Sequence, residues 1–199
     1  VPTLDRPALG FRIVVGAALI ACAAMNAPRL GQSLWDDEEY SVRRVILGSY
    51  QQKEGHPPKL KEVRWSDTLW YYAKPNNHFL NSILSRLSNS TWRMLTRPKG
   101  LQFSETALRL PAYLAGVLSV GVWALLLART GFPHAGMILA WLIALHPWYM
   151  RFIPQTRGYA LVFLFLPLAC WLGLAAVRDG RWRFWIASGA AQFALFYSW

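Results

Sequence analysis

Charged residues are scarce in this 199-residue chain. Asp, Glu, Lys and Arg make up 16% of it, against about a quarter in ordinary soluble proteins. Cysteine is almost absent: Cys22 and Cys170 both lie in apolar runs, outside any CxxC pair, and we expect both to be buried small hydrophobic residues. The chain also lacks a Gly-rich phosphate loop, a nucleophile elbow and two His residues spaced four apart. These absences argue against a disulfide scaffold, a structural zinc or haem site and a soluble globule.

Apolar residues are plentiful and unevenly spread. They make up 54% of the chain, the mean hydropathy is +0.21, and they gather in five runs. A bilayer-spanning helix needs about 20 apolar residues; three of the runs reach this length, the first is marginal and the last is cut off at Trp199. The predicted fold class is all-α, a polytopic membrane protein with about five transmembrane helices. The runs are Ile13–Ala27, Leu110–Ala128, Phe132–Met150, Gly158–Val177 and Phe184–Trp199.

Positive charge dominates the polar residues, with 21 Lys and Arg against 10 Asp and Glu and a formal net charge of +11. The basic residues lie between apolar runs and no nucleic-acid-binding motif accompanies them. We therefore expect membrane lipids or a phosphate-bearing lipid substrate as partners, and no nucleic acid. The positive-inside rule places the N-terminus in the cytoplasm. The inner arginines are then Arg6, Arg12, Arg129, Arg178, Arg181 and Arg183, and the short outer loop holds Arg151 and Arg157.

In this orientation residues 29–109 form a long outer, periplasmic loop. Five apolar side chains recur at helical spacing between Asn77 and Thr91, which predicts an amphipathic helix lying in the membrane interface. We expect a second short helix over Tyr40–Tyr50, separated from the first by His56-Pro57-Pro58. The first apolar run has an alternative as a cleaved signal peptide, which the sequence leaves open. The five apolar side chains are Phe79, Leu80, Ile83, Leu84 and Leu87.

Four consecutive acids, Asp36-Asp37-Glu38-Glu39, are the strongest local signal in the chain. Adjacent carboxylates repel one another, so the group would accept a cation or a proton from a substrate. Such a cluster suits a general base or a divalent metal ion. The alternative is an acidic first turn of a helix, where the helix dipole favours negative charge.

Three other polar patterns lie near the same predicted membrane face. Lys74-Pro75-Asn76-Asn77-His78 precedes the interfacial helix, either as an Asn N-cap after a Pro turn or as a polar patch facing the acids. Glu105 and Arg109 are spaced as an intrahelical ion pair, with phosphate binding by Arg109 as the alternative. Arg157, close to Tyr159, either extends to the interface or belongs to a site for an anionic substrate.

Four motifs thus follow one another, each at the outer end of an apolar run. They are Ser33-Leu34-Trp35-Asp36-Asp37-Glu38-Glu39-Tyr40-Ser41, Asn76-Asn77-His78-Phe79-Leu80-Asn81, Glu105 through Gly116, and Gln155-Thr156-Arg157-Gly158-Tyr159-Ala160-Leu161. In this order they resemble the N-terminal half of the GT-C superfamily of polytopic membrane glycosyltransferases. The similarity covers about residues 8–177 and is closest to the bacterial protein O-mannosyltransferases and aminoarabinose transferases.

The resemblance implies transfer of a sugar from a polyprenyl-phosphate donor to an acceptor, at the outer face of a bacterial cytoplasmic membrane. Asp37 would be the catalytic carboxylate, acting as base or as ligand of a divalent metal ion, with Glu38 as its partner and Asp36 as a further candidate. Charge that builds on the leaving phosphate would be stabilised by arginines. The substrate-binding residues implied are Arg109 and Arg157 for the phosphate, and Asn77, His78 and Tyr159 in the same cavity.

The number of apolar runs is smaller than this family usually has. Since the chain also begins with Val1 and is still apolar at Trp199, we expect residues 1–199 to be a single transmembrane domain within a larger GT-C module. Two hypotheses follow. The chain is either part of an active glycosyltransferase or a non-catalytic, GT-C-derived or structural subunit with other membrane subunits as partners.

Overall fold

Nearly all regular structure in this protein is helical. A computed structural model describes residues 8–51, 59–71, 77–98 and 102–198. The predicted all-α class is confirmed over these residues, whereas Arg6, the His56-Pro57-Pro58 break and Lys74 to Asn76 lie outside them. The elements are α1 (Leu9–Asn26), α2 (Asp36–Ser41), β1 (Gly48–Gln51), β2 (Lys59–Glu62), α3 (Trp65–Trp70), α4 (Phe79–Thr96), α5 (Glu105–Arg129), α6 (Pro133–Leu145), α7 (Pro147–Phe152), α8 (Tyr159–Asp179) and α9 (Trp182–Ser198).

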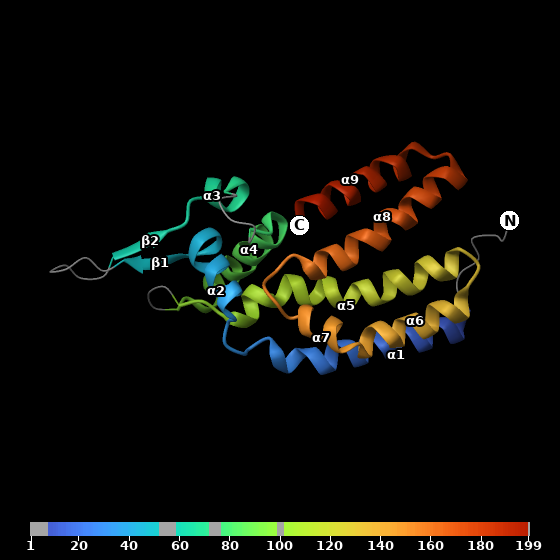
Figure 1. The fold of residues 1–199 in the computed structure, drawn as a ribbon, viewed down its shortest axis with the longest axis horizontal. Coiled ribbons are helices and arrows are strands. Elements are labelled where there is room, and N and C mark those ends of the chain that lie inside the picture. The colour runs from blue at the N-terminus through green and yellow to red at the C-terminus, as the bar shows by residue number, and fades with distance from the viewer. Residues whose placement is uncertain (1–7, 52–58, 72–76, 99–101, 199) are drawn as a thin grey trace.

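The molecule is elongated, with a helical bundle and a smaller cap at one end (Figure 1). Helices α1, α5, α6, α8 and α9 run along the long axis, and the cap consists of α2, β1, β2, α3 and α4. Helix α5 packs against α8, α6, α1 and α4, so it connects the bundle to the cap. The first turns of α5 and α8 and the whole of α7 lie on the cap side, which brings distant motifs to one end.

Three helices of the described chain are long and apolar enough to cross a membrane. They are Leu9–Arg29, Glu105–Arg129 and Tyr159–Asp179. The prediction of one continuous spanning helix over Phe132–Met150 is wrong, because the run divides into α6, with 13 residues, and α7. The break falls at His146, which is extended ahead of Pro147, since a proline disfavours helical backbone in the residue before it.

Small residues line the contacts between α1, α5 and α6. Ala18, Ala124 and Ala140 are fully buried, and a Cβ added at Gly136 would lie 2.5 Å from the carbonyl oxygen of Ala124. Close backbone approach through small residues is typical of packed membrane helices. Helix α1 is therefore an integral part of the bundle core.

The two cysteines differ in environment. Cys22 is buried in the cluster of α1, α5 and α6, as expected. The expectation of burial is wrong for Cys170, which lies exposed on α8.

The cap contains the predicted amphipathic helix, which appears as α4. Its buried residues are polar, among them Asn81 and Ser85, whose hydroxyl donates a hydrogen bond of 2.8 Å to the carbonyl of Leu108. Leu87 and Leu95 are exposed. The helix thus presents its polar side to α5 and leaves part of its apolar side free, which is suitable for a helix at a membrane interface.

The short helix predicted over Tyr40–Tyr50 is present only in part. Helix α2 continues as one π-helical turn over Val42–Ile46, and the chain then enters the antiparallel β1–β2 hairpin, in which Gly48 pairs with Glu62. Gly48 has φ +127°, and a Cβ added to it would collide with the carbonyl oxygen of Lys61, so a residue with a side chain would be strained there. The glycine ends the helix.

Candidate active site

The four consecutive acids point in four different directions. An α-helix turns by about 100° per residue, and all four lie in the first turn of α2. Asp36 is exposed, Asp37 faces a cavity, Glu38 is fully buried and Glu39 forms an ion pair with Arg43. The acids thus occupy a helix N-terminus, as the capping interpretation predicts, and two of them also have long-range partners.

Glu38 forms hydrogen bonds that connect three of the sequence motifs, those of α2, α5 and the segment before α8. Its Oε2 accepts hydrogen bonds from the backbone N–H of Trp35 (3.0 Å) and from Nη2 of Arg109 (2.6 Å). Its Oε1 accepts from Nε of Arg109 (3.1 Å) and from the backbone N–H of Thr156 (2.6 Å). A buried charge is tolerated when it is paired and hydrogen-bonded in this way. Glu38 therefore fixes α2 against α5 and against the segment that leads into α8.

Arg109 is the buried counterpart of this carboxylate. Besides Glu38, its terminal nitrogens donate to four backbone carbonyls, those of Arg29, Leu30, Gln32 and Ser33. The pair with Glu105 that the i, i+4 spacing suggested is replaced by the pair with Glu38. Because each guanidinium nitrogen already has a partner in the protein, this geometry favours a positioning residue over a phosphate ligand.

Asp37 lies on the opposite side of α2 from Glu39, in a cavity of about 220 Å³. Its carboxylate is 61% exposed, and its Oδ2 accepts a hydrogen bond of 3.1 Å from Nη1 of Arg157, which is 16% exposed. The guanidinium of Arg157 also rests 4.9 Å from the ring centroid of Tyr159. Asp37 is thus the exposed acid of this cluster whose cation partner comes from a distant segment, whereas Glu39 pairs four residues along the chain with Arg43.

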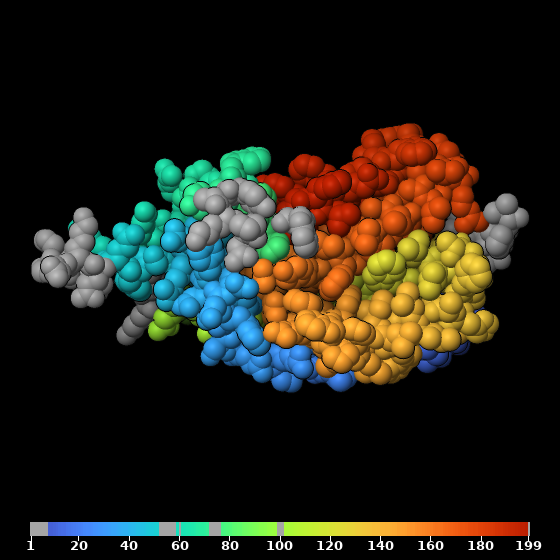
Figure 2. Space-filling model, in the orientation of Figure 1, coloured from blue at the N-terminus to red at the C-terminus, as the bar shows by residue number. Residues whose placement is uncertain are grey.

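A second cavity, of about 440 Å³, adjoins the first and shares Trp35, Arg151 and Gln155 with it. Arg29 also lines it and donates a hydrogen bond to the carbonyl of Met150. Figure 2 shows the blue surface around α2 beside the orange surface around α7, where these cavities lie.

Sequence reasoning assigned no role to Arg151. Its guanidinium carbon lies 5.3 Å from the ring centroid of Trp35 and 5.6 Å from that of Trp148, and both rings are exposed. Among the described residues Arg151 has no ion-pair partner. Two features of the sequence could have pointed to Arg151. It lies in the same short loop as Arg157, and Trp35, which it contacts, directly precedes the four acids.

The structure places Asn77, His78 and Tyr159 together, next to the Asp37 cavity but not in its described lining. Asn77 donates to the carbonyl of Tyr71 and accepts from Ser82. His78 packs 5.4 Å from the ring of Tyr159, whose other neighbours are Phe152 and Arg157. Of these residues, Tyr159 contacts Arg157, which pairs with Asp37. Substrate contact by the three residues remains a prediction.

A metal ion at Asp37 finds little support in the donor set. Glu38 is saturated by Arg109 and two backbone N–H groups, and Asp37 faces Arg157. Over residues 8–51, 59–71, 77–98 and 102–198, no group of three or more His, Cys, Asp or Glu could hold a metal ion. Among the described residues, the side chains around Asp37 therefore offer no complete set of protein ligands for a divalent metal ion.

Comparison with known families gives one match, which covers the second half of the chain. The family model described as dolichyl-phosphate-mannose-protein mannosyltransferase matches residues 100–197, about half of the chain. The match supports a GT-C-type membrane glycosyltransferase, so the predicted resemblance is confirmed over the segment that carries Arg109, Arg151 and Arg157. No curated protein and no solved structure gives a significant match.

Proposed function

We propose that this protein transfers a sugar from a polyprenyl-phosphate donor to an acceptor hydroxyl, with Asp37 as the catalytic carboxylate. The observation that carries the proposal is the placement of Asp37: accessible in a cavity, 3.1 Å from Arg157, on a helix anchored by the buried Glu38–Arg109 pair. The family description names a phosphate-linked mannose donor, which supports the donor class.

The chemistry needs one base and one or more cations. The acceptor oxygen attacks C1 of the sugar while the bond between C1 and the phosphate oxygen breaks, and the electron pair leaves with the phosphate. The carboxylate of Asp37 takes the acceptor proton. Charge that accumulates on the leaving phosphate is stabilised by fixed cations in the site. Asp36 lies outside this cavity and takes no part.

Arg151 is the best placed of these cations. It lines both cavities and is held by two tryptophan rings, whereas Arg109 is occupied by Glu38 and backbone carbonyls. The charge of Arg157 is already paired with that of Asp37. We therefore assign the donor phosphate to Arg151, with Arg157 as the partner of Asp37.

An apolar groove of about 710 Å³ leads to this position. It runs along α6, with Val14 of α1 opposite, and it ends at Pro147, which also lines the cavity that contains Arg151. A polyprenyl chain is apolar and its phosphate is anionic. The groove would therefore hold the polyprenyl chain, and the adjoining basic cavity would hold the phosphate.

The proposed orientation has the cap on the outer, periplasmic face of a bacterial cytoplasmic membrane, and the N-terminus inside. The start of α1 lies at the end of the bundle away from the cap. Arg129, Arg178, Arg181 and Arg183 lie at turns of that same end, which agrees with the positive-inside rule.

Replacing the proposed phosphate ligand tests the donor assignment. Arg151→Ala should raise the KM for the polyprenyl-phosphate sugar by about 10- to 100-fold, because a hydrogen bond to a charged group contributes about 1.5–3 kcal/mol. The measurement is a donor titration with the native protein in its membrane. Arg44→Ala is the matched control, since Arg44 is also exposed and lies 5.5 Å from a ring centroid, that of Tyr40, away from both cavities. An unchanged KM in Arg151→Ala would place the phosphate elsewhere.

A further inference from the structure

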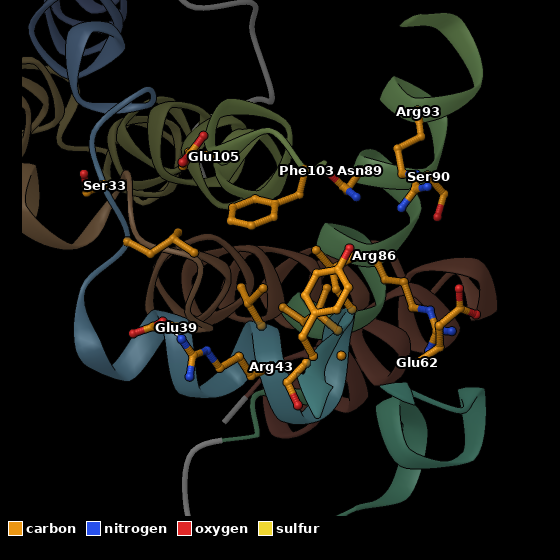
Figure 3. Close-up of a pocket in the computed structure, with 17 residues that line it drawn as sticks. Ser33, Glu39, Arg43, Glu62, Arg86, Asn89, Ser90, Arg93, Phe103 and Glu105 are labelled. Atoms are coloured by element: carbon orange, nitrogen blue, oxygen red, sulfur yellow. Dashed lines mark ion pairs between the residues drawn. The ribbon is translucent and has the colours of Figure 1, made fainter. Parts of the chain in front are cut away.

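A large cavity in the cap lies apart from Asp37, across α2. It measures about 750 Å³ and is bounded by α2, the π-helical turn, β1, α4 and the start of α5. Figure 3 shows Glu39 and Arg43 on one side and Phe103, Asn89 and Ser90 on the other. The volume lies within the range of small-molecule sites, roughly 300–1,000 Å³.

Asn89 is a buried polar residue in the wall of this cavity. It is fully buried, its Oδ1 accepts a hydrogen bond of 3.1 Å from the backbone N–H of Ser104, and its Nδ2 has no partner among the described residues. Buried donors are rarely left without a hydrogen bond. An acceptor atom of a bound molecule would satisfy this amide.

The charges on the walls define the kind of molecule. The wall carries three arginines and three glutamates, so its formal charge sums to zero and the cavity selects neither a polyanion nor a polycation. Glu39 neutralises Arg43. Arg86 is held by Thr68 and the carbonyl of Val63, and burial lowers the pKa of its guanidinium, which Glu62 opposes. The uncharged polar groups of the wall suit a neutral ligand whose groups both donate and accept hydrogen bonds. The charged residues are Arg43, Arg86, Arg93, Glu39, Glu62 and Glu105.

Two aromatic side chains also line the cavity, together with the aliphatic Leu34, Val42, Ile46 and Leu47. Tyr50 of β1 and Phe103, just before α5, both line the cavity and are both exposed. Flat apolar rings beside carboxylates, hydroxyls and an amide match the apolar faces and hydroxyl edges of a sugar ring. A peptide would instead require an extended groove or a long sheet edge, and β1 has four residues.

We propose that this cavity is a saccharide-binding site, separate from the site of transfer. Its ligand is a neutral oligosaccharide segment, which packs on Tyr50 and Phe103 and accepts a hydrogen bond from Nδ2 of Asn89. Binding here does not require transfer at Asp37.

Saturation-transfer NMR on the native protein in nanodiscs tests this site, with mannotriose, cellotriose and chitotriose as probes. At least one trisaccharide should receive saturation, and Phe103→Ala and Tyr50→Ala should each weaken its binding by 10-fold or more. Trp70→Ala, an exposed aromatic of the cap outside this cavity, should bind as the wild type does. Asp37→Asn should also bind normally, which separates this site from the proposed transfer.

A further variant tests the amide itself. Asn89→Asp keeps the acceptor for Ser104 and removes the free donor, so it should weaken trisaccharide binding while the thermal unfolding temperature confirms that the fold persists. The proposal is overturned if none of the three sugars binds, if Phe103→Ala and Tyr50→Ala bind as Trp70→Ala does, or if a Ser/Thr-rich heptapeptide occupies the cavity and no sugar displaces it.

Discussion

Asp37→Asn should lower the rate of sugar transfer by about 10²- to 10⁴-fold, the usual contribution of a general base. Asparagine has the same shape as aspartate but cannot take the acceptor proton. Asp37 is largely exposed and has one cationic partner, Arg157, so the substitution should leave the fold intact. The rate at saturating donor, measured in membranes with equal amounts of protein, gives the result.

The neighbouring acid supplies the control for this experiment. Asp36 lies one residue earlier in α2, exposed and outside the two cavities. Asp36→Asn should therefore retain near wild-type transfer. Full activity in Asp37→Asn would remove it as the base, and loss of activity in Asp36→Asn alone would transfer that role to Asp36.

Arg109→Ala is expected to destabilise the protein by about 3–5 kcal/mol, the usual effect of leaving one charge of a buried pair without its partner. Glu38 would remain in a fully buried position with two backbone N–H groups. The link from α2 to α5 would be lost together with the contacts to residues 29–33. Reversible unfolding in mixed micelles measures the change in free energy of unfolding.

An exposed ion pair provides the comparison. Arg64 and Asp67 are 3.3 Å apart, with Arg64 82% exposed, and Arg64→Ala should destabilise the protein far less than Arg109→Ala does. The double variant Glu38→Gln with Arg109→Met should be more stable than Arg109→Ala, because neither change leaves a buried charge. If Arg109→Ala unfolds like the wild type and only raises the KM for the donor, Arg109 is a phosphate ligand, as the sequence resemblance implied.

The sequence predicted the fold well where the length of an apolar run or its helical periodicity decides the structure. The runs at residues 110–128 and 158–177 are helices long enough to span, as predicted, and the amphipathic stretch is α4. The run at 13–27, expected to be marginal, belongs to a third helix of sufficient length. Hydropathy did not reveal the division of the third run, because a proline leaves the mean apolar character unchanged while it removes a backbone donor. Pro147 was visible in the sequence, and its local effect outweighed the apolar pattern.

The site was predictable as a set of motifs but not as a set of roles. Asp37 and Arg157 are paired although 120 residues separate them, and Glu38 connects α2 with Arg109 and Thr156. Which of four adjacent acids becomes buried depends on the rotation of a six-residue helix against α5, and composition does not encode this. The i, i+4 spacing favoured Glu105 as the partner of Arg109, but the buried Glu38 offers two aligned oxygens.

The most direct measurement follows a labelled sugar from donor to acceptor. Native membranes that contain this protein are incubated with polyprenyl phosphate carrying radiolabelled mannose, and the free polyprenyl phosphate and the labelled acceptor are quantified together. We expect one polyprenyl phosphate released for each sugar transferred, with both products lost in Asp37→Asn and retained in Asp36→Asn. Absence of labelled acceptor above membranes that lack the protein, or equal yields from wild type and Asp37→Asn, would contradict the assignment of this site as a glycosyltransferase centre.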